Sequence, residues 1–372
     1  MIMALHRADG RRHRPRHRAH PGARPVKRTP VLIVGAGAVG TVLGHHLRLS
    51  GAEVTHLVRP GRAQAHAAPK LLYDYDEDET KVYQGYHVVE RASELAGRDF
   101  PFVVITLDGR ASRTEQGVAT LTSLGDLVRG NDTVVIMCGV GLGLRRHYLD
   151  VLGVDEERLL FGVQGALAHQ ADPAFTAPPG GDAEAFARAD YCYAHPKRGT
   201  GFSVTRHNPT EAERFASLYN NSAVSRCSYL NPQVADAFSG ALFAIWAAWG
   251  LKGWPPLDEV IADKALWALA CDAQREILAL PANGRFGKLA AGVMGPKVTA
   301  AYHRAQERAV RPLDLAAFNA FHHGGKVREQ DVAMLRDLAA EGAGAGLPTT
   351  ALRELLGRLD GQGEPRELAA QG

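Results

Sequence analysis

One glycine-rich turn constrains the fold of this chain more than any other feature. An apolar run, residues 31–34, enters Gly35-Ala36-Gly37-Ala38-Val39-Gly40, which has the spacing G-x-G-x-x-G. A helix-forming stretch, residues 41–50, and a second strand-like run, residues 53–58, follow it. In a βαβ unit of this kind the first glycine turns out of the strand, the second lets the backbone approach a pyrophosphate, and the third packs helix against strand. The free N–H groups at the helix N-terminus favour phosphate. The turn therefore predicts a dinucleotide site.

The residues that end the second strand distinguish between dinucleotides. An acid about 20 residues after the turn binds the ribose 2′-OH of NAD, whereas an arginine accommodates a 2′-phosphate. This chain has Arg59 there, followed by Arg62, and no carboxylate. The pattern predicts NADPH. FAD uses the same turn but requires an acid at the strand end, so it is disfavoured, and a solvated loop is the alternative interpretation of the two arginines.

Net charge says little about function because one tail dominates it. The chain has 372 residues and a formal charge of +3, yet residues 1–28 hold nine Lys or Arg and one acid. The remainder is therefore net negative, and we predict no nucleic-acid partner. The tail has no apolar face or secretory core, so it is predicted to be disordered. A misassigned start codon and a surface role remain alternative explanations of it.

The spacing of the cysteines and the lengths of the apolar runs limit which structural classes of protein this chain can belong to. The four cysteines are far apart and form no C-x-x-C pair, so neither a zinc ribbon nor a disulfide framework is predicted. A reducing cytoplasm is the expected location. The most apolar run, Ala241–Leu251, has eleven residues, fewer than the roughly 20 that span a bilayer. We therefore predict no membrane segment.

Strand and helix signals predict two domains. A hairpin, residues 71–88, precedes a buried-type strand, residues 102–107, a helix, residues 113–129, and a strand, residues 133–137; residues 170–200 are predicted to be irregular. This alternation predicts an α/β fold with a Rossmann-type doubly wound sheet over residues 29–208. An all-α domain is predicted over residues 209–360, with a loose tail at 361–372. Its predicted helices are 210–219, 233–250, 257–280, 296–311, 314–321, 329–341 and 349–359. Ligands of such sheets lie beyond the carboxyl ends of the strands, which places Thr106, Leu107, Asp108, Cys138 and Gly139 near the nicotinamide.

Together these motifs resemble the ketopantoate reductase family. The glycine turn, Arg59, the strand ending in Thr106-Leu107 and the later Gly139-Val140-Gly141 are similar to the family's cofactor half. The helix Asp314-Leu315-Ala316-Ala317-Phe318-Asn319 and the segment Gly346-Leu347-Pro348-Thr349 resemble its C-terminal motifs. The resemblance implies NADPH-dependent reduction of a 2-keto acid with a lysine on a long helix as general acid. It also implies a homodimer through the helical domain.

The substrate half departs from the family pattern. The family's catalytic lysine falls at about Gly240, and its asparagine before the Gly-x-Gly falls on Cys138. Asp314 matches the family's glutamate in kind, and Asn319 keeps its asparagine. A positioned general acid contributes typically 10² to 10⁴ in rate, so ordinary ketopantoate reduction is not expected unless another group replaces the lysine.

Several residues could supply the missing chemistry. His322, His323 and Lys326 follow the Asp314 helix and could donate a proton or bind a carboxylate, with a polar loop as the alternative. Adjacent histidines lack the i, i+4 spacing of a zinc site, so no metal is predicted.

Four further positions are candidates for substrate contact or for packing. Tyr302 and His303 are candidate substrate contacts, with packing or solvent exposure as the alternative. Cys138 could touch a nicotinamide or substrate, although packing is the better explanation, since a catalytic thiolate needs a nearby base or cation. Lys252 is expected to be a surface residue at the end of its helix.

Two functions are compatible with this sequence. The first is an NADPH-dependent oxidoreductase that reduces a C=O or C=N group of a small molecule. An iminium substrate already carries its proton, so its reduction is compatible with the absence of the family's general acid. The second is a non-catalytic NADP-binding sensor or accessory protein.

Overall fold

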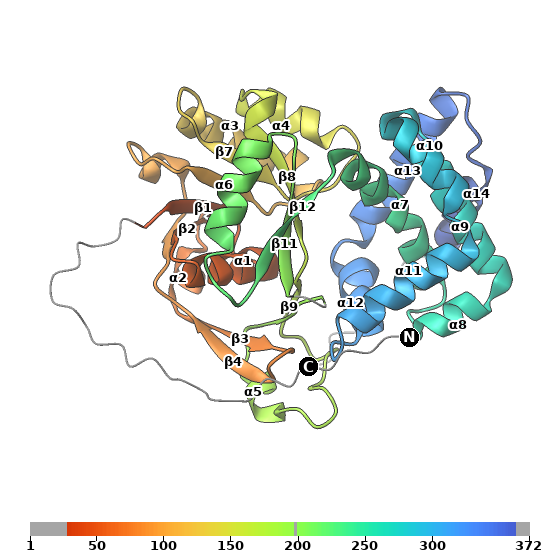
Figure 1. The fold of residues 1–372 in the computed structure, drawn as a ribbon, viewed down its shortest axis with the longest axis horizontal. Coiled ribbons are helices and arrows are strands. Elements are labelled where there is room, and N and C mark those ends of the chain that lie inside the picture. Colours follow the sequence, from red (N-terminus) through yellow and green to blue (C-terminus); the bar gives the residue numbers. More distant parts are fainter. Residues whose placement is uncertain (1–27, 197–198, 362–372) are drawn as a thin grey trace, which may run out of the picture.

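The computed structural model describes residues 28–196 and 199–361, which form a sheet-containing half beside a helical half (Figure 1). The predicted basic tail, 1–28, and loose tail, 361–372, lie outside these residues except for Arg28 and Gly361. The predicted α/β class is confirmed, with a Rossmann-type domain followed by a helical region.

Eight strands of the described residues form the main sheet, in the order β12-β11-β8-β7-β6-β1-β2-β5. All neighbours are parallel except β8 and β11. The strands are β1 (Pro30–Val34), β2 (Glu53–Leu57), β5 (His87–Val89), β6 (Phe102–Ile105), β7 (Val134–Met137), β8 (Leu159–Gln164), β11 (Thr200–Thr205) and β12 (Arg226–Leu230).

Helices cover both faces of this sheet, because its central strands are buried on both sides. One face packs against α1 (Ala38–Leu49) and α6 (Pro209–Tyr219). The other packs against α3 (Glu115–Val128) and α4 (Leu144–Leu152). Short helical segments occupy the connections: α2 (Ala63–Ala67), η1 (Ala92–Leu95), η2 (Ala111–Arg113) and η3 (Glu156–Arg158).

A second sheet of four strands lies below the first in Figure 1, in the order β4-β3-β10-β9. The predicted hairpin is confirmed in β3 (Lys70–Asp74) and β4 (Glu79–Tyr83), but it joins this sheet. The prediction that residues 170–200 are irregular was wrong in part. They contain α5 (Ala183–Ala187) and β10 (Tyr191–Ala194), which pairs with both β3 and β9 (Leu167–Gln170).

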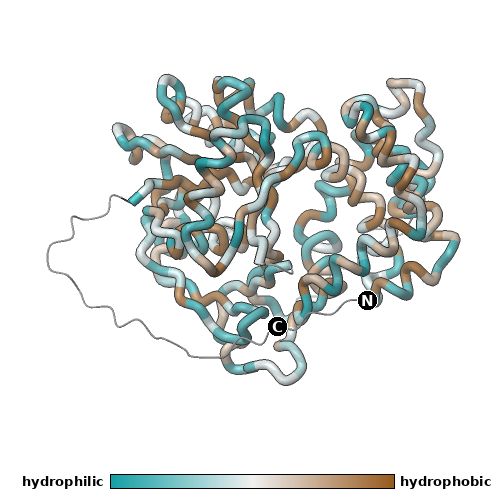
Figure 2. Tube along the Cα trace, viewed as in Figure 1, coloured by the Kyte–Doolittle hydropathy of each residue, from teal (hydrophilic) through white to brown (hydrophobic). Residues whose placement is uncertain are grey.

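The helical half is centred on α7 (Pro232–Leu251) and α9 (Lys264–Leu278), which share one hydrophobic core. Figure 2 shows hydrophobic residues interspersed with hydrophilic ones over the helical half. The other elements are α8 (Leu257–Ala262), η4 (Pro281–Asn283), α10 (Gly284–Val293), α11 (Pro296–Ala309), α12 (Leu315–Phe321), the π-helical turn η5 (His322–Lys326), α13 (Arg328–Gly344) and α14 (Thr350–Gly361).

Three details of the helical prediction need correction. Strands do not end before Thr210, because β12 extends the main sheet. The single helix predicted over 257–280 is two, α8 and α9, since the Asp263 side chain caps a new helix by accepting from the Leu266 N–H. α10 was not predicted, because its three glycines give it weak helix propensity.

Helix α7 is also longer than its apolar run suggested. By length and composition alone its 20 residues could cross a membrane, but half of the tested window is buried inside the protein. Because α7 is the centre of the helical core, a core helix explains its apolar character.

Candidate functional site

The glycine turn has the geometry that its sequence predicts. Gly35 has φ +109°, which disfavours a side chain, and a Cβ there would lie 2.5 Å from Thr106 Oγ1. A Cβ at Gly40 would lie 2.5 Å from the Gly35 carbonyl oxygen, so α1 packs directly on the turn. Gly37 is exposed, and a Cβ there would meet no atom within 4 Å. The backbone at Gly37 is therefore open to a ligand.

This turn forms the floor of a cavity of about 1030 Å³, the cofactor cavity. The predicted cofactor residues line it with one exception: Gly35, Ala36, Gly37, Ala38, Val39, Gly40, Arg59, Arg62, Thr106, Leu107 and Asp108 are all present. The exception is Gly139, which packs against the Leu107 carbonyl oxygen. The size of the cofactor cavity and the open backbone at Gly37 fit a dinucleotide.

Two exposed arginines stand at the rim of the cofactor cavity. Arg59 and Arg62 form no ion pair within the described residues, which leaves both guanidinium groups available to an anion. The nearby Glu90 holds their loop: it accepts the Ala63 N–H at 2.7 Å, and backbone N–H groups of Ala63 and Gly61 keep its pKa below the usual value. The Glu90 carboxylate therefore already accepts hydrogen bonds from backbone N–H groups of its own loop.

Sequence reasoning missed two polar residues of the cofactor cavity. The Tyr191 hydroxyl donates to the Ala36 carbonyl at 3.2 Å, which links β10 to the glycine turn. Gln170, at the end of β9, also lines the cavity. Both come from the second sheet, whose pairing brings residues far apart in sequence to the turn.

Lys326 is the predicted catalytic residue that the fold brings to the cofactor cavity. It ends the η5 turn, is exposed, and lines the cavity from the helical side. Its neighbour His322 stacks on Phe318, with ring centroids 5.7 Å apart. Burial, together with the smaller effects of His323 and Lys326, lowers the pKa of His322 to about 3, and the Asp108 charge opposes this shift. Near neutral pH the cation at this wall is therefore Lys326.

His323 instead lines a second cavity of about 470 Å³ among α7, η5 and α13, the helical cavity. Its ring stacks on Trp246 with centroids 3.8 Å apart, and its Nδ1 lies 2.7 Å from Asp331 Oδ2. Burial lowers the pKa of His323 to about 3 and raises the pKa of Asp331 to about 8. The pair is therefore net neutral near pH 7, with one proton between the two side chains.

The remaining candidates lie away from both cavities. Asp314 is exposed and caps α12, accepting the N–H groups of Ala316 at 2.9 Å and Ala317 at 3.1 Å. Asn319 is buried on the same helix. Neither lines the cofactor cavity or the helical cavity.

Tyr302 and His303, on α11, also line neither cavity. The His303 ring lies edge-on to Trp267, and burial lowers its pKa to about 4. Cys138 packs against the sheet core, and burial raises the pKa of its thiol to about 12. The thiol is therefore neutral and unreactive near pH 7.

Comparison with known proteins identifies the cofactor half. No curated protein matches this sequence. Residues 31–174 match the family model described as ketopantoate reductase PanE/ApbA. These residues, fewer than half of the chain, are therefore similar to the ketopantoate reductase family.

Solved structures extend the likeness to both halves of the chain. The 2-dehydropantoate 2-reductase of Geobacter metallireducens GS-15 is 17% identical with a TM-score of 0.62, covering 90% of this chain and 99% of its own. A probable 2-dehydropantoate 2-reductase of Bacillus subtilis is 17% identical with a TM-score of 0.60, covering 89% and 99%. D-mandelate dehydrogenase in complex with NADH is 12% identical with a TM-score of 0.60, covering 90% and 98%. At these identities the likeness establishes the fold.

The position at which the ketopantoate reductase pattern places its lysine does not face a cavity here. A Cβ at Gly240 would point toward Leu338 and Ile277, at 3.5 and 3.6 Å, inside the helical core. The 20 residues of α7 contain no lysine or arginine, and Lys252 beyond its end lies 3.4 Å from Asp263. The long helix therefore provides no cation to a substrate.

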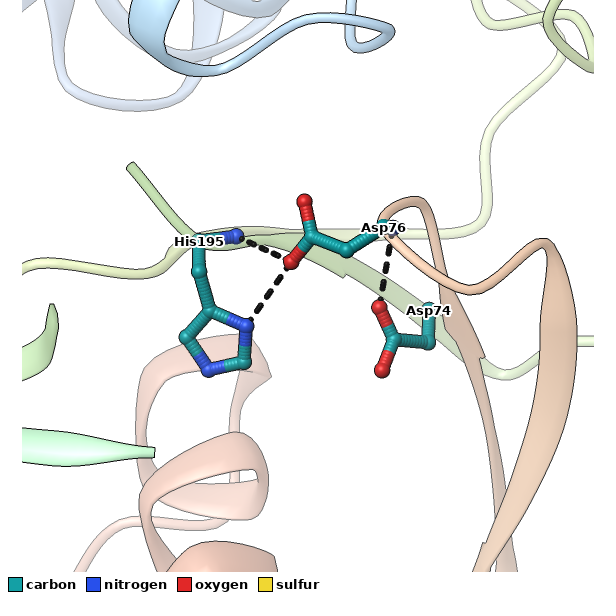
Figure 3. Close-up of side chains that lie close together, drawn as sticks. All are labelled: Asp74, Asp76 and His195. Atoms are coloured by element: carbon teal, nitrogen blue, oxygen red, sulfur yellow. Dashed lines mark hydrogen bonds and ion pairs between the residues drawn. The ribbon is translucent and has the colours of Figure 1, made fainter. Parts of the chain in front are cut away.

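A separate polar cluster outside the cofactor cavity has a structural role. Asp74, Asp76 and His195 offer metal-ligand atoms within 4.8 Å of one another. Figure 3 shows that they already bind each other: Asp76 Oδ2 accepts from the His195 backbone N–H and lies 2.8 Å from His195 Nδ1. Asp74 accepts from the Asp76 N–H and the Tyr193 hydroxyl. The geometry is that of a satisfied hydrogen-bond network.

This network continues to Ser225, whose Oγ lies 3.2 Å from His195 Nε2. The order Asp76, His195, Ser225 matches the arrangement of a hydrolase triad. Ser225 is only 2% exposed, however, so a substrate carbonyl cannot reach its hydroxyl. The chain of bonds instead ties the second sheet to α6 through the Tyr219 hydroxyl, which lies 2.9 Å from Ser225 Oγ.

Proposed function

We propose that this protein is an NADPH-dependent oxidoreductase that reduces a C=O or C=N group of a small molecule. The observation that carries the proposal is the place of Lys326. It brings one cation from the helical half to the cavity formed by the glycine turn and by Thr106, Leu107 and Asp108. The match of residues 31–174 to the ketopantoate reductase family model supports a reductase.

The turn residues and the rim arginines would hold the cofactor in different ways. The open backbone at Gly37 and the N-terminus of α1 suit the pyrophosphate, and the unpaired Arg59 and Arg62 suit a 2′-phosphate. Bound NADPH supplies a hydride to the substrate. The protein must then supply a proton or a positive charge at the reduced atom, and Lys326 is the candidate for both.

Cofactor preference is tested by calorimetry with NADPH and NADH on wild type and on the Arg59→Ala and Arg62→Ala variants. A charged hydrogen bond contributes roughly 1.5–3 kcal/mol, so each variant should bind NADPH about 10- to 100-fold more weakly and NADH unchanged. Arg146→Ala, an exposed arginine paired with Asp150 on α4, is the control. Equal affinity for the two cofactors in wild type would refute the preference for NADPH.

Catalysis is tested by following NADPH oxidation with a panel of 2-keto acids and cyclic imines. Lys326→Met should lower kcat by roughly 10² to 10⁴ while NADPH affinity changes less than threefold. Lys252→Met removes a surface lysine of the same half and should change neither. An unchanged kcat in Lys326→Met would exclude this lysine as proton donor or charge stabiliser.

A non-catalytic NADP-binding sensor is the second candidate function. It is favoured by α7, which lacks the lysine implied by the family resemblance, and by the low pKa values of His322 and His323. Tight NADPH binding without turnover on any carbonyl or imine of the panel would support the sensor over the enzyme.

We further propose a cytoplasmic homodimer without nucleic-acid or membrane partners. Supporting the dimer, Leu289, Val293, Val298 and Tyr302 on α10 and α11 are exposed by 37 to 70%. Light scattering on wild type and Leu289→Glu tests this: a monomeric wild type, or a variant that remains dimeric, counts against an interface there.

A further inference from the structure

The helical cavity contains features that the proposed reduction does not use. It lies on the other side of η5 from the cofactor cavity: Lys326 lines one, whereas His323 and Gly324 line the other. Its volume of about 470 Å³ lies in the range of small-molecule pockets. A second ligand site is therefore sterically available.

One buried acceptor in this cavity lacks a hydrogen-bond donor. Asp331 is 8% exposed, and its Oδ2 is occupied by His323 Nδ1 at 2.7 Å. Its Oδ1 is buried and has no partner among the described residues. When the shared proton lies between Oδ2 and Nδ1, Oδ1 remains an acceptor. Buried acceptors are almost always satisfied, so this atom calls for an N–H or O–H group from a ligand or a water.

A cation lines the same cavity without neutralising that carboxyl group. Arg328, one turn before Asp331 on α13, lines the helical cavity and the adjoining cavity bounded by Arg110 and Glu329. Within the described residues Arg328 and Asp331 do not form an ion pair with each other. An arginine without an ion-pair partner and a carboxyl oxygen without a donor, in one cavity, match a ligand that carries an anionic group and an N–H donor group.

The other walls are aromatic. Trp246 stacks on His323, and Phe243 meets Trp246 edge-on at 5.2 Å. Trp254 lines the cavity from a left-handed backbone with φ 61°, a strained conformation for this residue type. A Cβ at Gly324 would lie 2.5 Å from Trp254 Nε1, so glycine lets the indole close over the turn. Such walls accommodate an apolar or aromatic group and favour a nearby ammonium.

We propose that the helical cavity binds a small amino-acid-type zwitterion with an apolar or aromatic side chain. Its ammonium group binds Asp331, its carboxylate binds Arg328, and its side chain packs against Trp246 and Trp254. The site is independent of the proposed reduction, since none of these residues lines the cofactor cavity.

Calorimetry on the full chain without cofactor tests the site with three probes that differ in one charge each. L-phenylalanine carries both charges, phenethylamine lacks the carboxylate, and 3-phenylpropionate lacks the amine. We expect phenylalanine to bind with a dissociation constant below about 5 mM and each analogue to bind at least about tenfold more weakly. Weaker phenylalanine binding than this, or equal binding of 3-phenylpropionate, overturns the proposal.

Two variants assign the charges. Asp331→Asn should weaken phenylalanine binding at least about tenfold, whereas Asp337→Asn, an exposed aspartate on the same helix, should not. Arg328→Met should weaken phenylalanine but leave phenethylamine unchanged, with Arg336→Met as its matched control. Unchanged phenylalanine affinity in both Asp331→Asn and Arg328→Met overturns the assignment. NADPH affinity, measured on every variant, reports whether the chain is folded and tests the reduction separately.

Discussion

The two glycines at 37 and 40 should separate cofactor binding from folding. Both belong to the same turn, but the space around them differs. A Cβ at Gly37 meets nothing within 4 Å, whereas a Cβ at Gly40 would lie 2.5 Å from the Gly35 carbonyl oxygen and 3.3 Å from Thr106 Oγ1. One methyl group therefore enters the cofactor cavity, and the other enters the contact between α1 and β1.

The expected magnitudes follow from these environments. At residue 37, φ is −75°, which alanine adopts readily. Alanine is a poorer N-cap than glycine, which destabilises the folded chain, but it also restricts the unfolded chain, which stabilises the folded one. These effects roughly cancel, so Gly37→Ala should change the free energy of unfolding by less than about 0.5 kcal/mol. The methyl group would displace the pyrophosphate from backbone N–H groups. Losing one charged hydrogen bond weakens NADPH binding about 10- to 100-fold.

Gly40→Ala should show the opposite pattern in stability. Overpacking against a backbone carbonyl costs about 1–3 kcal/mol, and the better helix propensity of alanine offsets about 1 kcal/mol of it. Because 2.5 Å to a backbone oxygen is far inside contact distance, the cost lies near the upper end of this range, and the free energy of unfolding should fall by about 2 kcal/mol. Gly292→Ala, at a helical position in α10 with no atom within 4 Å, is the control for both measurements.

Urea unfolding followed by circular dichroism measures stability, and calorimetry with NADPH measures binding. Gly37→Ala that binds NADPH as tightly as wild type would refute the assignment of the turn as the phosphate floor. Gly40→Ala that is as stable as wild type would show that α1 does not depend on that close contact.

Three shorter predictions concern ionisable and buried groups. Between pH 6.5 and 8 the Asp331 carboxyl should reduce stability by up to about 1.4 kcal/mol per pH unit. The reason is that the pKa of Asp331 is about 8 in the folded chain and 3.8 in the unfolded chain, so a proton that stabilises the folded chain is lost as pH rises. In urea titrations, Asp331→Asn should abolish this dependence of stability on pH. The control variant Asp337→Asn should retain it. Tyr193→Phe should destabilise the chain by about 1–3 kcal/mol, since it leaves buried Asp74 Oδ2 without the hydroxyl donor at 2.8 Å, whereas exposed Tyr229→Phe should change little in the same titration. Burial raises the pKa of all four thiols to about 11 or 12, so mass spectrometry should find none alkylated by iodoacetamide at pH 8 in the folded chain and all four alkylated in guanidinium. Cys138 is partly exposed, so its rapid labelling in the folded chain would contradict the raised pKa of its thiol.

The cofactor half could be predicted from the sequence because its determinants are local. The glycine turn, the strand before it and the helix after it occupy consecutive residues, and their spacing reports backbone geometry directly. The second sheet could not be predicted in the same way. β3 pairs with β10, as in Leu72 beside Tyr191, and no local pattern specifies a partner so far along the chain.

The catalytic half was harder to predict because its arrangement depends on tertiary contacts. His322 and His323 are adjacent in sequence and their rings meet edge-on at 4.8 Å, yet one stacks on Phe318 and the other on Trp246. The pairing of His323 with Asp331 crosses from this turn to α13, and neither residue signals it alone. Asp314 matched a family position but serves here as a helix cap, a role that its residue type equally favours.

The cations of the helical half that line the two cavities come from neighbouring elements. The long helix α7 carries Phe243, Trp246 and Trp249, of which Phe243 and Trp246 line the helical cavity. Lys326 of η5 lines the cofactor cavity, and Arg328 in the first turn of α13 lines the helical cavity. The two cavities share no lining residue, so the ligand proposed for the helical cavity should bind without contacting Lys326.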